Sequence, residues 1–448
     1  MFAHSFAVFN NRLLREAVAG SGEDSLLVTV LAVTYAAILI LLSFYGGHRY
    51  TLLYQYWRSR RQQPKPLRMF DAAELPGVTL QLPLFNEQYV VEGLLECVCR
   101  IDYPKDRLQI QVLDDSTDET RMIAAEAVAL WRSRGFDIQL IHREDRHGFK
   151  AGALEAALCQ ARHELVAILD ADFRPDPDFL KRAVHYFSDP KVAVVQGRWG
   201  HLNDSDNLLT RVQTVMLDGH FLVEHPARNR SGRFFNFNGT AGLWRLSAIR
   251  DSGGWHCETL TEDLDLSYRA QLRGWKFIYD PSIVCPAELP VEMNAFKSQQ
   301  HRWAKGSVQV MKKILPSILR SSQPLAVKVE AFFHLTGNLA YLLMLGICGL
   351  TLPMLVARGR VADGVLGGFL DATLFFMATA SVVVFYSTAQ ILGYRAWRER
   401  LGAVPMMLAV GIGLTVNQSK AVLEALIGHD SAFVRTPKYA QGGTEHRD

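Results

Sequence analysis

The sequence carries almost no excess of either charge and no cysteine pattern typical of a metal site. Lys and Arg number 48 and Asp and Glu 45 in 448 residues, a formal net charge of +3. Such a small excess argues against a nucleic-acid partner in the absence of a concentrated basic face. The six cysteines include no Cys-x-x-Cys pair and lie mostly in apolar or helical contexts, which predicts reduced structural thiols.

Charged residues of any kind are also scarce. They make up 21% of the chain against 49% apolar residues, and the mean hydropathy is +0.04. This much apolar material excludes a disordered chain and a small disulfide-stapled scaffold. The mean hydropathy is high for a soluble enzyme, and the apolar excess is gathered in a few segments.

The first apolar segment runs from Leu26 to Tyr45, twenty residues without a charge. A helix of this length crosses about 30 Å of hydrocarbon, so we expect a transmembrane helix over residues 26–46, after an N-terminal segment of residues 1–25. A cleaved signal peptide is the alternative, but the run is long, starts late and lacks a small-residue cleavage pattern. The basic stretch Trp57–Arg68 then predicts that the chain beyond the span is cytoplasmic.

Two further apolar stretches predict transmembrane helices over residues 331–357 and 366–394. Residues 405–427 are apolar in their first half and amphipathic in their second, which contains Lys420 and Glu424. We therefore expect an interfacial helix there rather than another crossing. The prediction is a multi-pass protein of the cell (inner) membrane.

Residues 76–316 have a globular composition and form the predicted cytoplasmic domain. Strand-like and helix-like segments alternate in its first half, which predicts an α/β fold with a parallel sheet covered on both faces. Ligands of such sheets bind beyond the carboxyl ends of the strands. The expected strands are Val78–Leu82, Leu108–Leu113, Ile138–Ile141 and Leu165–Leu169, with helices near Tyr89–Cys99, Thr117–Arg132 and Lys150–Ala161.

Acidic residues stand at two of these strand ends. Asp114 and Asp115 close the second strand, and Asp170 and Asp172 follow the fourth. Either motif alone is also typical of a helix cap or a turn. Together they concentrate negative charge, which is costly unless a cationic or hydrogen-bonding group binds there. Mg²⁺ or Mn²⁺, coordinated by Asp170 and Asp172 and by diphosphate oxygens, is the simplest such group.

Three later motifs complete the set. Phe237-Asn238-Gly239-Thr240 opens a Gly-containing stretch that ends at Arg245. Thr261-Glu262-Asp263 is also typical of a helix start, with Thr as N-cap and acids favoured by the helix dipole. The third motif is Gln299-Gln300-His301-Arg302-Trp303. Its alternative interpretation is an interfacial helix with Arg and Trp at the level of the lipid headgroups.

With these motifs the chain resembles the membrane-embedded family-two glycosyltransferases, the group of cellulose, hyaluronan and chitin synthases. It is most similar to the plant cellulose-synthase-like mannan synthases and their bacterial relatives. The resemblance covers about residues 76–316 and continues weakly in Phe433–Lys438, similar to the family's gating loop with Arg435 where valine is usual. The matching segments are Leu82–Glu87, Asp114–Asp118, Lys150–Leu154, Asp170–Asp172, Phe237–Arg245, Thr261–Asp263 and Gln299–Trp303.

The resemblance implies a GT-A type, Rossmann-like nucleotide-sugar domain inserted between transmembrane helices. It implies that Asp263 is the general base, that Asp170 and Asp172 hold the metal ion, and that a single displacement inverts the anomeric centre. Cellulose synthases have cysteine at the position of Asn238. The residues implied in substrate binding are Asp114, Asp115, Lys150, Asn238, Gly239, Glu262, Gln299, Arg302, Trp303 and, within a gating-loop-like tail of residues 431–448, Thr436 and Lys438.

More specific roles follow from the same resemblance. Asp115 together with Asp114 would hydrogen-bond the nucleoside. Gln299, Arg302 and Trp303 would hold the diphosphate and the acceptor sugar, since Arg offers fixed donors to phosphate and Trp a stacking face.

The main functional expectation is a hexosyltransferase that adds hexose from a UDP- or GDP-hexose to a growing β-linked polysaccharide of glucan, mannan or glucomannan type. The alternative is a glycolipid synthase that adds one or a few β-linked sugars to diacylglycerol or ceramide. Three expected crossings favour the alternative, because a three-helix channel is thin and would need a homo-oligomer or an accessory export subunit. An inactive sugar-binding scaffold would require losses at the acidic motifs, and all are intact. The expected partners are a nucleotide sugar, a glycan or lipid acceptor, and membrane lipid.

Overall fold

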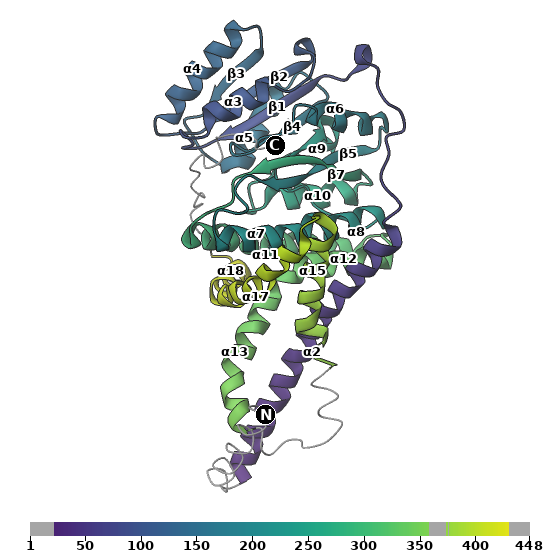
Figure 1. Cartoon of the computed structure of the whole chain (residues 1–448), viewed down its shortest axis with the longest axis vertical. Helices are drawn as coiled ribbons and strands as arrows, with labels where there is room; N and C mark the ends of the chain where they lie inside the picture. Colours follow the sequence, from purple (N-terminus) through teal and green to yellow (C-terminus); the bar gives the residue numbers. More distant parts are fainter. Residues whose placement is uncertain (1–21, 358–372, 375, 430–448) are drawn as a thin grey trace.

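The computed structural model describes residues 22–357, 373–374 and 376–429. In this part of the chain an α/β domain lies at one end, and long helices lead away from it (Figure 1). A layer of helices lies between the sheet and the long helices.

A seven-stranded sheet forms the centre of the domain, in the order β3-β2-β1-β4-β6-β5-β7. β1 pairs in parallel with β2 and β4, and β2 pairs in parallel with β3, which confirms the parallel sheet expected for the first half. β6 is antiparallel to both β4 and β5, and the sequence pattern did not indicate this reversal. The strands are β1 (Val78–Leu84), β2 (Leu108–Asp114), β3 (Asp137–His142), β4 (Leu165–Ile168), β5 (Val192–His201), β6 (Gly242–Arg245) and β7 (Lys276–Ala287).

Strand β4 shows how the sheet is buried on both faces. Leu165 and Ala167 pack into the core on one face, while Val166 and Ile168 pack into the core on the other. Successive side chains of a strand point to opposite faces, so an unbroken apolar run is typical of a sheet covered twice. The first face is covered by α3 (Val91–Cys99), α4 (Thr120–Ser133) and α6 (Phe179–Val184), and the second by α5 (Phe149–Ala157), α9 (Leu246–Asp251) and α10 (Glu262–Leu272).

The layer below the sheet starts with α7 (Leu208–Asp218), which has a reciprocal N-terminal cap. The Asn207 side chain accepts from the Thr210 backbone N–H at 2.9 Å, and the Thr210 hydroxyl accepts from the Asn207 N–H at 3.1 Å. The chain continues without a break through the π-helix η5 (Gly219–Glu224) into α8 (His225–Arg230). The other members of the layer are α11 (Met293–Arg320) and α12 (Leu325–Thr336).

Three helices in the described ranges are long and apolar enough to cross a membrane: Thr29–Ser59, Leu325–Met354 and Phe376–Gly393. They comprise most of α2 (Gly22–Ser59), then α12 with most of α13 (Ala340–Ala357), and finally η8 (Phe376–Ala380) with α15 (Ser381–Gly393). Residues 1–21 and part of the segment expected over residues 366–394 lie outside the description.

The segment expected as one interfacial helix forms two helices, α17 (Val404–Gly413) and α18 (Thr415–Ile427), which meet at 46°. Taken together as one broken span, they would be a fourth crossing. The amphipathic half, α18, packs on α11: Glu424 Oε2 lies 3.1 Å from Lys305 Nζ. Glu424 of α18 thus faces helix α11. Short helical turns complete the described chain: η1 (Ala72–Glu74), η2 (Lys105–Arg107), η3 (Leu158–Gln160), η4 (His185–Ser188), η6 (Gly337–Leu339), α16 (Trp397–Arg400) and η9 (Leu401–Ala403).

The six cysteines are all free thiols. Cys99 and Cys285 are buried in the core on the α3 face of the sheet, and burial raises the pKa of the Cys285 thiol well above its usual value. A buried neutral thiol behaves as a small apolar side chain.

Candidate active site

A cavity of about 240 Å³ opens beyond the carboxyl ends of β1 and β4, where the N-terminus of α10 and the first turns of α11 face the sheet. Among the predicted residues that the structure describes, all but Asp114 line it. They are Asp115, Lys150, Asp170, Asp172, Asn238, Gly239, Glu262, Asp263, Gln299, Arg302 and Trp303. Motifs spread over nearly two hundred residues thus meet at one site.

Asp114 and Asp115 have different surroundings. The Asp114 carboxylate is fully buried, where it accepts from the Ser116 N–H at 3.0 Å and contacts His142 Nδ1 at 2.8 Å. Asp115 lines the cavity, and Arg143 holds its carboxylate through two contacts, 2.8 Å to Oδ1 and 2.5 Å to Oδ2. Asp114 therefore organises the loop, while Asp115 is the one presented to a ligand.

Lys150 links two of the motifs. Its Nζ lies 2.5 Å from Asp170 Oδ1 and donates to the Gly239 carbonyl at 2.9 Å. Burial alone would lower the pKa of Lys150, but the Asp170 and Glu262 carboxylates outweigh it and raise the pKa. The ammonium group is therefore a fixed positive charge between the strand-end acids and the Asn238–Gly239 turn.

Asp263 lies at the N-terminus of α10, and its Oδ1 accepts from the Leu264 N–H at 2.8 Å. Desolvation, reinforced by the neighbouring Glu262 carboxylate, raises the pKa of Asp263 to about 7. Burial likewise raises the pKa of Glu262. A carboxylate with a pKa near neutrality is suited to exchange a proton with a bound hydroxyl.

Gln299, Arg302 and Trp303 come from α11, where spacings of three and four residues place them on one face of the helix. Across the cavity, Trp199 of β5 faces Trp303 with ring centroids 6.3 Å apart and planes at 57°. The two indoles form an aromatic wall of the kind on which sugar rings stack.

The sequence of the domain matches, over residues 76–306, the family described as "Glycosyltransferase like family 2". The chain belongs to this family. This confirms the recognition made from the motifs and identifies the domain as that of a family-two glycosyltransferase.

Among curated relatives, the glycosyltransferase is 40% identical over 308 residues to glucomannan 4-beta-mannosyltransferase 2 of Arabidopsis thaliana, covering 66% of this chain and 58% of that protein. It is 43% identical over 254 residues to glucomannan 4-beta-mannosyltransferase 1 of Oryza sativa subsp. japonica, covering 55% and 49%. The chain thus spans about half the length of the curated relatives it matches.

The glycosyltransferase is also similar in fold to a solved mannosyltransferase, PcManGT from Pyrobaculum calidifontis, in complex with GDP-Man and Mn²⁺. The TM-score is 0.59 at 22% identity, covering 88% of this chain and all of that one. The GT-A type α/β fold is therefore confirmed.

Several groups of this glycosyltransferase site could not be picked out from the sequence. Arg143 stands in an ordinary charged stretch after β3, and Trp199 in a strand without an acidic motif. Arg146, whose guanidinium lies 3.3 Å from the centroid of the Phe85 ring, also lines the cavity. Thr436 and Lys438 lie outside the described residues, so their placement stays a prediction.

No group of three or more His, Cys, Asp and Glu residues is arranged to hold a metal ion within the described ranges. The Asp170 and Asp172 pair nevertheless lines the cavity at the end of β4. Two carboxylates fit a hard divalent ion that takes its remaining ligands from phosphate oxygens and water, as Mg²⁺ commonly does.

Proposed function

We propose that this chain is an inverting, metal-dependent hexosyltransferase that extends a β-linked polysaccharide at the membrane. The observation that carries the proposal is the convergence of Asp263, the Asp170–Asp172 pair and the Gln299–Trp303 face on one cavity. The names of the curated relatives, glucomannan 4-beta-mannosyltransferases, favour a mannan or glucomannan product. GDP-mannose is accordingly the first donor to test, with UDP-hexoses next.

The donor is held by charge at its nucleotide end. Asp115, fixed by Arg143, accepts hydrogen bonds from the nucleoside, with Asp114 shaping the loop beneath it. Arg302 offers planar donors to the diphosphate. When bound at Asp170 and Asp172, Mg²⁺ or Mn²⁺ supplies positive charge that stabilises the departing nucleotide.

Transfer follows from the position of Asp263. Its carboxylate takes the proton of the acceptor hydroxyl while that oxygen bonds to the anomeric carbon of the donor. The bond from the anomeric carbon to the diphosphate breaks, and the nucleoside diphosphate leaves with the electron pair. A single displacement inverts the anomeric centre, so an α-linked donor gives a β-linked product.

The remaining cavity groups act on the acceptor. Trp303 and Trp199 provide the stacking surface, and Gln299 a hydrogen-bonding amide beside it. The Asn238–Gly239 turn and Glu262 border the same space. We place the acceptor sugar between this wall and Asp263.

The membrane arrangement is part of the proposal. We infer from the basic stretch after the first span that the catalytic domain lies on the cytoplasmic side, and we take the membrane to be the cell (inner) membrane. The tail with Thr436 and Lys438 would have to share that side to close over a bound nucleotide. A homo-oligomer or an accessory export subunit would complete a channel for the polymer.

A glycolipid synthase is the second candidate, and one observation favours it. The described residues contain only three helices that would each cross a membrane, or four with the bent pair, which form a thin wall for polymer export. The acceptor would then be a diacylglycerol or a ceramide.

A donor panel tests the proposal. The purified membrane protein is incubated with radiolabelled GDP-mannose, GDP-glucose and UDP-hexoses in Mn²⁺, and organic-soluble lipid is separated from ethanol-insoluble polymer. We expect label from GDP-mannose in the polymer fraction. Label confined to the lipid fraction would establish the glycolipid synthase instead, and no transfer from any donor would contradict both.

A further inference from the structure

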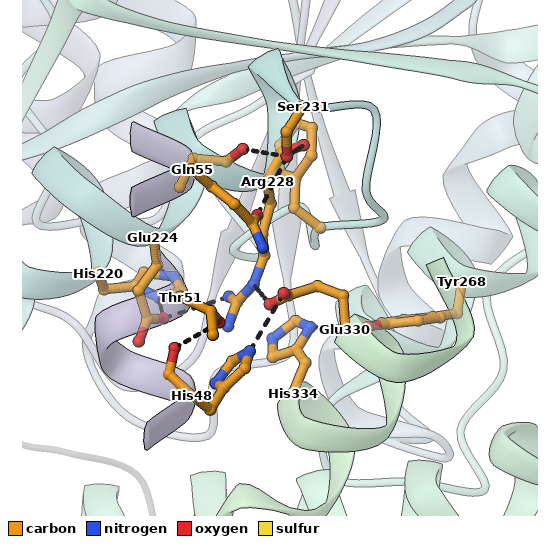
Figure 2. Close-up of polar contacts among 12 residues, drawn as sticks. His48, Thr51, Gln55, His220, Glu224, Arg228, Ser231, Tyr268, Glu330 and His334 are labelled. Carbon is orange, nitrogen blue, oxygen red and sulfur yellow. Dashed lines mark hydrogen bonds and ion pairs between the residues drawn. The ribbon is translucent and has the colours of Figure 1, made fainter. Parts of the chain in front are cut away.

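A largely buried polar cluster joins helix α8 to the membrane helices α2 and α12 (Figure 2). We call it the relay cluster and define it by five residues: His48, His220, Glu224, Arg228 and Glu330. In Figure 2 the Arg228 side chain stands between Glu224 and Glu330, and His48 reaches Glu330 from α2. None of these five residues belongs to the motifs recognised in the sequence.

At the catalytic end the cluster holds the amide of Asn238, which lines the cavity. His225 Nε2 donates to Asn238 Oδ1 at 2.5 Å, and Asn238 Nδ2 lies 2.9 Å from His220 Nε2. Because an amide nitrogen only donates, His220 Nε2 must accept and His220 carries its proton on Nδ1. That proton points at Glu224 Oε2, 3.0 Å away.

The second histidine has the opposite tautomer. His225 must carry its proton on Nε2, and its Nδ1 is buried without a hydrogen-bond partner among the described residues. Burial lowers the pKa of His225 well below its usual value, so this ring is neutral. The pair of tautomers fixes which way the Asn238 amide faces.

In the middle of the cluster the charges are paired, and two of the three charged side chains are buried. Arg228 Nη1 lies 3.2 Å from Glu224 Oε2, and Arg228 Nε lies 2.9 Å from Glu330 Oε1. The side chains of Arg228 and Glu330 are each 3% exposed. Burial opposes the charge on Glu224, but Arg228 and His220 lower the pKa of Glu224 well below its usual value. Each charged group in the cluster is thus stabilised in its ionised form by an oppositely charged or hydrogen-bonding neighbour.

The other end of the cluster lies at the membrane helices. Glu330 Oε2 contacts His48 Nε2 at 3.1 Å, and the His48 ring stacks on Phe333 with centroids 4.4 Å apart. His48, Glu330 and Phe333 line a second cavity of about 870 Å³ between α2 and α12, whose remaining walls are largely apolar. The contacts therefore run unbroken from a membrane-level cavity to the catalytic cavity.

The turn held by the cluster is itself in contact with the reacting groups. The Gly239 carbonyl accepts from Lys150, the partner of Asp170, and the Gly239 α-carbon faces Asp263. A shift of the Asn238–Gly239 turn would move these groups relative to the donor. Displacements of about 1 Å in an active site can slow turnover about 10²-fold.

We propose that His220, Glu224, Arg228 and Glu330 are positioning residues for glycosyl transfer, which hold the Asn238–Gly239 turn against Lys150 and Asp263 and tie it to helices α2 and α12. This inference rests on the proposed hexosyltransferase function. These side chains touch neither donor nor acceptor, but they connect the membrane helices to the Asn238–Gly239 turn of the catalytic cavity.

The test compares His220→Leu with His220→Gln, measuring kcat and the KM for the donor in the full-length protein. Leu can neither accept from Asn238 nor donate to Glu224, whereas Gln can do both. We expect His220→Leu to lower kcat about 10²-fold with donor KM within twofold of wild type, and His220→Gln to recover most of the loss. His185→Leu is the control: this buried histidine accepts from the Phe70 N–H at 3.0 Å and lines neither cavity, so kcat stays near wild type.

A double-mutant cycle tests the connection to α12. Glu330→Gln removes the negative charge of the carboxylate that contacts both Arg228 and His48. If both act through one network, the His220→Leu/Glu330→Gln variant has a kcat no lower than the slower single variant. If the fold-losses of kcat in the two single variants multiply in the double variant, or if kcat in His220→Leu is unchanged, the network is overturned. The proposed function still stands in either case, provided that the wild-type protein transfers sugar. A wild-type protein without transfer would overturn both.

Discussion

Gly239 and Asp263 lie so close that a Cβ on Gly239 would stand 3.1 Å from Asp263 Oδ2. Gly239 also has φ +77°, in the left-handed region that only glycine adopts without strain. The turn in the Phe-Asn-Gly-Thr motif is therefore part of the wall around the proposed base. Its glycine is required both for backbone conformation and for the room that Asp263 occupies.

Gly239→Ala should accordingly impair catalysis more than stability. The left-handed backbone costs about 1–2 kcal/mol of unfolding free energy, and the methyl group displaces the Asp263 carboxylate, so we expect turnover to fall by about tenfold or more. Thermal unfolding and radiolabel transfer measure the two effects.

Gly232→Ala is the matched control, because Gly232 has φ +69° and nothing within 4 Å of its Cβ position. It should lose similar stability but keep its activity. Equal activity in the two variants would remove the catalytic reason for Gly239.

The transfer rate should depend on pH through Asp263. Burial and the Glu262 carboxylate raise the pKa of Asp263 to about 7, and only the deprotonated form can take a proton. The rate constant should therefore rise with pH from about 6 to about 8 and then level off. A profile of kcat against pH at saturating donor measures this. A rate that stays constant from pH 5 to pH 8 would contradict the assignment of the base.

Removing the metal ion should stop transfer. Treatment with EDTA is expected to abolish activity, and Mn²⁺ or Mg²⁺ to restore it, since Asp170 and Asp172 offer hard oxygen ligands in the cavity. Asp172→Asn should raise the metal concentration needed for half-maximal activity. Asp176→Asn, an exposed position in the same loop, is the control and should leave that concentration unchanged. Full activity in EDTA would exclude the metal-dependent mechanism.

Arg228 should contribute more to folding than any surface arginine. Arg228→Met removes the guanidinium from the buried Glu330 carboxylate and from the half-buried Glu224 carboxylate, which should cost about 3–5 kcal/mol of unfolding free energy. Glu330→Gln should cost less, because Arg228 keeps Glu224. Unfolding measurements on the variants in lipid nanodiscs give the order of their losses in unfolding free energy.

Arg273→Met is the control for that order. The exposed pair of Arg273 with Asp251 predicts a change within about 1 kcal/mol. If Arg228→Met were no more harmful than Arg273→Met, the account of a charged buried cluster would be wrong.

The sequence predicted the features that are local in the chain. The expected strands match β1 to β4 within a few residues, because each is a short segment rich in apolar and β-branched residues that ends at a polar or acidic turn. The acidic motifs predicted Asp115 and Asp170 as neighbours because carboxyl ends of parallel strands meet at one edge. Asp263 lies at a helix start, and only the resemblance to the family placed it in the same site. The bend at Leu414 was not expected, and it separates an apolar helix from one whose Glu424 pairs with Lys305.

The long-range pairings could not be predicted from the sequence, for a physical reason. Arg228 and Glu330 are a hundred residues apart, and neither lies in a motif or at a recognisable periodicity. Their pairing depends on how α8 packs against α12, which only the tertiary structure defines. The same holds for Arg143, whose contact with Asp115 requires β2 and β3 to be in parallel register.

Comparison of wild-type protein with Asp263→Asn, both incubated with radiolabelled GDP-mannose and Mn²⁺, tests the central claim most directly. The account predicts that wild type forms an ethanol-insoluble product that a β-mannan hydrolase digests, and that Asp263→Asn binds the donor but transfers no sugar. Ordinary turnover in Asp263→Asn, or an α-linked product from wild type, would contradict it.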